Sequence, residues 1–172
     1  MRIFTAIMLS LFILSCNGNS PASYINWIES ESGFVRNIEA ENFNISLQYC
    51  PVNYLKLTNK SDIASDSIYY FIMKVEPKDH LIANGFSFNQ SYFAFDFPIH
   101  ILVKEDMHSC EIIFWHMENT YNITSARNFL MAVKKTDNDH KNKLVFSIES
   151  EIINKDKIDF TFDLSREPKV QL

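Results

Sequence analysis

Short segments in which apolar and polar residues alternate recur along this chain, and they restrict the fold more than any other feature of the sequence. In residues 158–164, Ile, Phe, Phe and Leu alternate with Asp, Thr and Asp. Successive side chains of a strand point to opposite faces of a sheet, so a period of two indicates a strand with one buried face. Residues 43–49 show the same alternation, with Phe, Ile, Leu and Tyr on one side.

Similar patterns predict strands along most of the chain, separated by residues that favour turns. The further strands are expected at residues 34–40, 68–75, 86–97, 99–103, 110–117 and 144–149. Two of them, 68–75 and 110–117, are apolar on both sides, which is typical of strands in the middle of a sheet. Glu41–Asn42 is the expected turn of a hairpin, and with 3 glycines in the chain, Asn and Asp are expected where a turn needs positive φ.

Three segments are less decided. Residues 24–30 fit a strand or a short helix, and residues 52–57 fit an irregular turn or a short edge strand. Residues 126–135 fit a helix capped by Thr124, but we favour a strand because residues 144–149 look like its partner. The sequence therefore predicts a mainly β chain, a single-domain antiparallel β-sandwich, with an α+β fold containing one short helix near residues 124–135 as the alternative.

The N-terminal residues have the order of a secretory signal. Arg2 precedes an apolar run over residues 3–14, which is too short to span a bilayer. The run ends in Ile13-Leu14-Ser15-Cys16, which resembles the lipobox of bacterial lipoproteins. The resemblance implies cleavage after Ser15, a diacylglycerol on the Cys16 thiol and attachment to the membrane through this lipid. We expect a signal peptide over residues 1–15, a tether over 16–22 and a β-sandwich domain over 23–172.

A looser resemblance covers most of the remaining chain. Its motifs are Trp27-Ile28, Leu47-Gln48-Tyr49-Cys50-Pro51 with Tyr54, and Ile158-Asp159-Phe160-Thr161-Phe162. These look like small hypothetical lipoproteins of Bacteroidetes, and the resemblance implies a place in the cell envelope and a non-enzymatic role. Asp66-Ser67-Ile68 resembles the O-glycosylation sequon of the same bacteria.

Charge and cysteine content restrict the partners. The net charge is −5, and removing residues 1–15 takes away Arg2 and no acidic residue. An acidic chain without a cluster of Lys or Arg is not expected to bind nucleic acid. Beyond Cys16, the cysteines are Cys50 and Cys110, which either form a disulfide in an oxidising envelope or lie as two buried thiols.

Motifs of catalysis, phosphate binding and metal binding are absent from the sequence, so no cofactor, metal or catalytic residue is predicted. The weak metal candidates are Met107, His108, Cys110, His116 and Met117, and the acidic loop Asp137-Asn138-Asp139-His140. In a regular strand Cys110 and His116 are about 20 Å apart, which argues against one shared site. The carboxylates Glu29, Glu31, Glu39 and Glu41 are expected on a solvated edge.

Aromatic residues are the more interesting class, since exposed rings can form binding surfaces. The candidates are Trp27, Tyr49, Tyr54, Tyr69, Tyr70, Tyr92, Trp115 and Tyr121.

The functional expectation is a lipid-anchored cell-envelope protein that acts as a binding or interaction module, with a protein or a glycan as ligand. One alternative is an immunity or chaperone-like partner of a secreted toxin, which the acidic residues Asp137 and Asp139 would serve. The other is a hydrolase with an unrecognised site.

Overall fold

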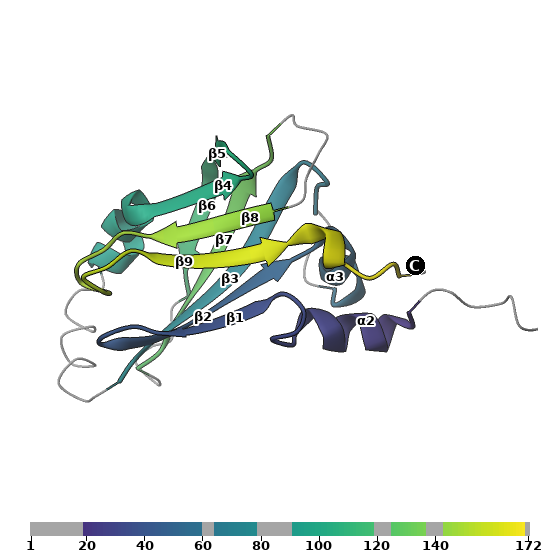
Figure 1. The fold of residues 1–172 in the computed structure, drawn as a ribbon, viewed down its shortest axis with the longest axis horizontal. Helices are drawn as coiled ribbons and strands as arrows, with labels where there is room; N and C mark the ends of the chain where they lie inside the picture. Colours follow the sequence, from purple (N-terminus) through teal and green to yellow (C-terminus); the bar gives the residue numbers. More distant parts are fainter. Residues whose placement is uncertain (1–18, 60–63, 79–90, 119–124, 137–142, 171–172) are drawn as a thin grey trace, which may run out of the picture.

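The computed structural model describes residues 19–59, 64–78, 91–118, 125–136 and 143–170. Its strands are β1 (Val35–Glu39), β2 (Phe43–Cys50), β3 (Ile68–Pro77), β4 (Ile101–Glu105), β5 (His108–Cys110), β6 (Ile112–Met117), β7 (Arg127–Lys134), β8 (Lys143–Ile148) and β9 (Ile158–Asp163). They form a five-stranded sheet in the order β1-β2-β3-β7-β6 and a four-stranded sheet in the order β5-β4-β8-β9. Figure 1 shows the four-stranded sheet lying over the five-stranded one. The predicted fold, a mainly β antiparallel sandwich, is confirmed.

Local alternation places the strands, and long-range pairing orders them. The predicted β1–β2 hairpin is present, with Ile38 opposite Ile45. The strand favoured over residues 126–135 is β7, which removes the alternative with a helix there. Its expected partner was wrong, because β7 pairs with β3 and β6, whereas β8 pairs with β4 and β9. Antiparallel neighbours along the chain are therefore divided between the two sheets.

The prediction that residues 110–117 form one central strand is also wrong. The chain leaves the four-stranded sheet after β5, passes through Glu111 and enters the five-stranded sheet as β6. Both β5 and β6 are edge strands, and Ile113 and Phe114 of β6 are 47% and 52% exposed. An apolar run that is continuous in sequence thus serves two sheets.

Helical segments occupy places where the sequence was ambiguous or misleading. Residues 24–30 lie in or just after α2 (Pro21–Ile28), which is capped by the Ser20 hydroxyl at 3.2 Å from the Ser23 N–H and has Pro21 in its first turn. Residues 52–57 form α3 (Val52–Leu57), not a turn or an edge strand. A further short helix, η3 (Leu164–Arg166), follows β9.

The strand predicted over residues 86–97 is replaced, within its described part, by η1 (Tyr92–Asp96) and η2 (Phe97–His100). Phe93 and Phe97 are four residues apart and both are buried, with ring centroids 6.2 and 6.0 Å from that of Phe129. Phe95 is 78% exposed. Aromatic residues at every second position therefore satisfied a strand pattern, while packing against β7 selected helical turns. Residues 86–90 lie outside the described residues.

The core lies between the sheets and is rich in aromatic rings. The Phe34 ring contacts that of Tyr49 at 5.0 Å, and Phe71 joins Tyr49 to Phe162 of the opposite sheet at 5.7 and 6.1 Å. At Gly33, a Cβ atom would lie 1.8 Å from the Trp27 carbonyl oxygen, so only glycine fits beside α2. The expectation for turns is confirmed, since the described positive φ angles belong to Asn59 (52°) and Asp106 (53°).

The two ends of the described chain meet. The Asn19 N–H donates to the Lys169 carbonyl at 3.2 Å, and Asn19 forms a parallel bridge with Val170. Within the segment expected as a tether, Asn19 is therefore hydrogen-bonded to the C-terminal part of the chain and Pro21 begins α2. None of the helices in the described ranges is long and apolar enough to cross a membrane.

Candidate functional site

The five-stranded sheet has one face in the core and one outer face that the four-stranded sheet does not cover (Figure 1). The pairing register arranges the outer side chains in rows across the strands. The first row is Cys50, Tyr70, Ala132 and Phe114, and the second is Gln48, Ile72, Leu130 and His116. The third row holds Ser46, Lys74 and Asn128. Side chains of one face recur every second residue, so rows are about 7 Å apart.

A groove of about 770 Å³ lies over these rows. Its lining residues are Cys50, Leu55, Tyr70, Phe71, Ile72, Lys74, Phe114, Glu118, Asn128, Leu130, Met131 and Ala132. Leu55 of the lining belongs to α3, and α3 lies at the end of the sandwich where α2 also lies (Figure 1). The volume is within the range of small-molecule sites, and the first two rows make most of the lining apolar.

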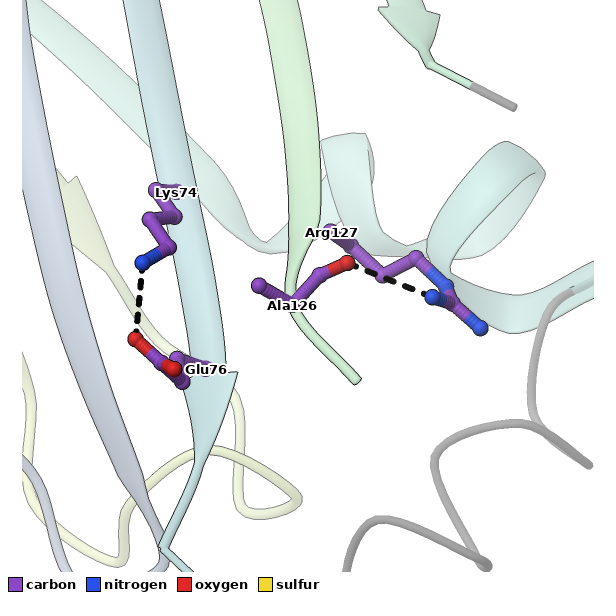
Figure 2. A network of polar contacts seen from close by, with 4 residues as sticks. All are labelled: Lys74, Glu76, Ala126 and Arg127. Carbon is purple, nitrogen blue, oxygen red and sulfur yellow. Dashed lines mark hydrogen bonds and ion pairs between the residues drawn. The ribbon is translucent and has the colours of Figure 1, made fainter. Parts of the chain in front are cut away.

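The polar end of the groove carries both signs of charge. The Lys74 Nζ atom lies 2.8 Å from Glu76 Oε2, and both side chains are about half exposed, at 48% and 45%. Asn128 Nδ2 donates to Glu118 Oε2 at 2.9 Å. Figure 2 shows the Lys74–Glu76 pair on β3, with the Arg127 side chain of β7 extending away from this pair. Arg127 is 3% exposed, and burial lowers the pKa of its guanidinium group. A second hollow of about 480 Å³ continues beyond Lys74 toward β1.

Gln48 adds a polar group beside the apolar rows. The part of the chain that the structure describes supplies no hydrogen-bond partner to its buried Nε2 atom. Gln48 lies between Val35 and Ile72 in the register. An unpaired buried donor of this kind costs about 1–3 kcal/mol, and Gln48 itself is not among the residues that line the groove.

Sequence reasoning did not single out this groove. It interpreted residues 68–75 as buried on both faces, whereas Tyr70 and Ile72 are only partly buried and line an open surface. The signal that pointed to it is Lys74, one charged residue in an otherwise apolar run. Of the aromatic candidates, Tyr70 is the one that the described lining contains. Phe114, which was not a candidate, also belongs to the lining.

The two cysteines lie on different sheets. Cys50 is on the outer face of β2 in the groove lining, and Cys110 is on β5 opposite Val103. The two are not joined by a disulfide in this structure, and burial raises the pKa of the Cys110 thiol. Cys16 and the lipobox lie outside the described residues.

The weak metal candidates are not brought together. His108 and Cys110 belong to β5, whereas His116 and Met117 belong to β6 in the other sheet. Within the described ranges, no group of three or more His, Cys, Asp or Glu side chains is placed to hold a metal ion. Asp137 to His140 and Tyr121 lie outside those ranges.

The four N-terminal glutamates are exposed and hold structural contacts. Glu29 accepts a hydrogen bond from the Tyr54 hydroxyl at 2.7 Å, and Glu31 accepts one from Asn37. Glu39 pairs with Lys78 at 3.7 Å, and Glu41 pairs with Lys155 at 3.8 Å. Exposed pairs of this kind contribute little to stability, and no contact of these glutamates sets up acid–base chemistry.

Three tyrosines are buried at the end of the sandwich near α2. Tyr24 and Tyr69 donate to Glu167 and Glu105 at 2.7 and 2.5 Å. Burial, the largest cause, raises the phenol pKa of Tyr24, Tyr49 and Tyr69 well above the ordinary value of 10.0, and the nearby carboxylates add to the effect. These hydroxyls are therefore donors fixed in the neutral form.

This cluster predicts a steep loss of stability in alkali. The unfolded chain loses phenolic protons near pH 10 while the folded chain keeps them, so the stability is present below pH 10 and is lost as the pH rises. Each buried phenol removes about 1.4 kcal/mol per pH unit, and the three together about 4 kcal/mol per unit. Urea unfolding between pH 8 and 11 measures this slope. Tyr69→Phe should reduce it by roughly a third. Phenolate absorbance that corresponds to all seven tyrosines near pH 10 without unfolding would contradict the prediction.

The described residues form an antiparallel β-sandwich with a mostly apolar groove on the outer face of one sheet. No protein-family model, no curated protein and no solved structure matches the chain.

Proposed function

We propose that this protein is a lipid-anchored protein of the bacterial cell envelope whose β-sandwich binds a ligand through the outer-face groove. The groove is the observation that carries the proposal. Contiguous apolar surface is seldom left open on a soluble domain, and where it occurs with a few polar groups at its border it marks a binding site. The lining contains no histidine, and its carboxylate Glu118 is hydrogen-bonded to Asn128, which favours binding over catalysis.

The anchor is supported by the lipobox and is consistent with the start of the fold. Three Cα–Cα steps separate Cys16 from Asn19, which is bonded to the C-terminal segment, so the two Cα atoms are at most about 11 Å apart. A lipid on Cys16 then holds the α2 end of the sandwich close to the membrane. Leu55 of α3 brings the groove to this same end (Figure 1).

Photocrosslinking in intact cells tests the proposed binding site. Phe114 is replaced by the photoreactive residue benzoylphenylalanine, which preserves an aromatic ring at the groove, and a matched variant carries it at Phe95, which is 78% exposed on η1. Irradiation is expected to give a discrete adduct from position 114, detected by mass spectrometry. Equal yields at both positions, or an adduct from position 95 alone, would contradict the assignment of the groove as the binding site.

A further inference from the structure

The apolar part of the groove excludes most kinds of ligand by its chemistry. Among the lining residues, Ile72, Leu130 and Ala132 present only carbon atoms, and the Tyr70 hydroxyl accepts the Ser65 N–H at 3.0 Å. The polar members of the second row, Gln48 and His116, do not belong to the lining. A peptide or a sugar placed here would leave amide or hydroxyl groups without hydrogen-bond partners, which is unfavourable away from water. An alkyl chain has no such groups and gains from contact with this surface.

The polar row specifies the other end of the ligand. Lys74 on β3 and Glu118 just after β6 are separated by β7, two strand spacings or about 10 Å. Lys74 is the cation that the described part of the chain contributes to the lining, and its half-exposed pair with Glu76 is of the weak surface kind that a ligand can displace. Opposite charges at this spacing suit a head group that carries both an anion and a cation.

We infer that the groove binds the alkyl chain of a zwitterionic amphiphile, with its anionic group at Lys74 and its cationic group at Glu118. The inference rests on the proposed function, because it names the ligand class of the same groove. The source is a membrane lipid taken out of the bilayer, since an anchor on Cys16 would keep the groove beside the membrane; its head group then lies at the end of the groove away from α3.

Binding is tested with the purified expected mature chain, residues 16–172, carrying Cys16→Ser, which lacks both the apolar signal segment and the proposed acyl group. Dodecylphosphocholine, hexylphosphocholine and the uncharged dodecyl maltoside are titrated below their micelle concentrations by calorimetry. We expect saturable binding of one dodecylphosphocholine per chain, with affinity rising about fourfold for each buried methylene between the two phosphocholines. Dodecyl maltoside should bind more weakly, because it offers no anion to Lys74.

Variants separate the two halves of the groove. Leu130→Glu places a charge in the second row and is expected to weaken binding of both dodecyl amphiphiles by at least about tenfold. Its matched control is Val145→Glu, on the outer face of β8 in the other sheet, which should bind like the parent. Lys74→Met should weaken dodecylphosphocholine about tenfold and leave dodecyl maltoside unchanged.

Circular dichroism establishes that each variant is folded, and Phe114→Ser on the exposed edge strand replaces Leu130→Glu if that variant does not fold. The inference is overturned if no saturable binding occurs, if Leu130→Glu and Val145→Glu bind alike, or if Lys74→Met weakens both head groups equally. An adduct at position 114 in cells together with absent amphiphile binding would leave the proposed function standing and reject this ligand class. Absence of both results would reject both proposals.

Discussion

The Cys16→Ser protein is expected to carry no covalently bound fatty acid and to leave the membrane fraction. The proposed modification needs the Cys16 thiol as the acceptor of the diacylglycerol group, and a serine hydroxyl is a much weaker nucleophile. Each acyl methylene contributes about 0.8 kcal/mol to membrane association, so two or more chains hold the protein almost irreversibly and their loss releases it. Metabolic labelling with an alkyne palmitate, followed by fractionation, measures both effects.

Cys110→Ser is the matched control, because it makes the same exchange on the short edge strand β5, at a partly buried site. Label and membrane association should be unchanged in this variant. Labelled palmitate in the Cys16→Ser protein would reject the lipid anchor. The groove proposal would then have to stand on the crosslinking result alone.

Glu105→Ala should lower the free energy of unfolding by about 3–5 kcal/mol. Glu105 is 0% exposed, and its two carboxylate oxygens accept hydrogen bonds from the Tyr69 hydroxyl at 2.5 Å, the Thr136 N–H at 2.9 Å and the Thr136 hydroxyl at 2.6 Å. Alanine leaves all three donors without this acceptor inside the protein. Domains of this size are stable by about 5–15 kcal/mol, so the change removes a large fraction of that stability.

Urea unfolding followed by tryptophan fluorescence measures the loss, with Trp115 stacked on Phe129 at 4.9 Å as the reporter of the core. Tyr69→Phe removes one donor and keeps the acceptor, so it should cost only about 1–2 kcal/mol. The double variant should be less destabilised than the sum of the single variants, because the two residues share one hydrogen bond. Additive losses would show that Glu105 and Tyr69 stabilise the fold independently.

The sequence predicted this part of the structure poorly. In the sequence, Glu105-Asp106 is a polar pair typical of a turn, and Asp106 has the positive φ of a turn residue. The burial of Glu105 could not be predicted, since it depends on Tyr69 and Thr136, which lie 36 and 31 residues away along the chain. A polar residue beside a turn is usually solvated. Glu105 is buried because Tyr69 of β3 and Thr136 after β7, both from the five-stranded sheet, lie against it.

The same division applies to the candidate site. The strands that form the groove were expected from their own residues, β3 and β7 among them. The exposure of one face of these strands was not expected, because the residues around Tyr70 are apolar on both sides, which is typical of a strand buried on both faces. Whether the second face is covered depends on how many layers the domain builds, and this chain builds two sheets.

By itself the sequence determined the β class of the fold, most strand positions and the use of Asn59 or Asp106 in place of glycine at turns, because these follow from side-chain alternation and backbone preference within a few residues. It also contains the adjacent residues Ile13-Leu14-Ser15-Cys16, which resemble a lipobox. Only the tertiary structure decided that residues 110–117 are divided between two sheets, that residues 92–100 turn into helix against Phe129, and that the four-stranded sheet leaves one largely apolar face of the other sheet uncovered. Each of these depends on which distant segment covers a given side chain, and burial by a distant partner leaves no local pattern.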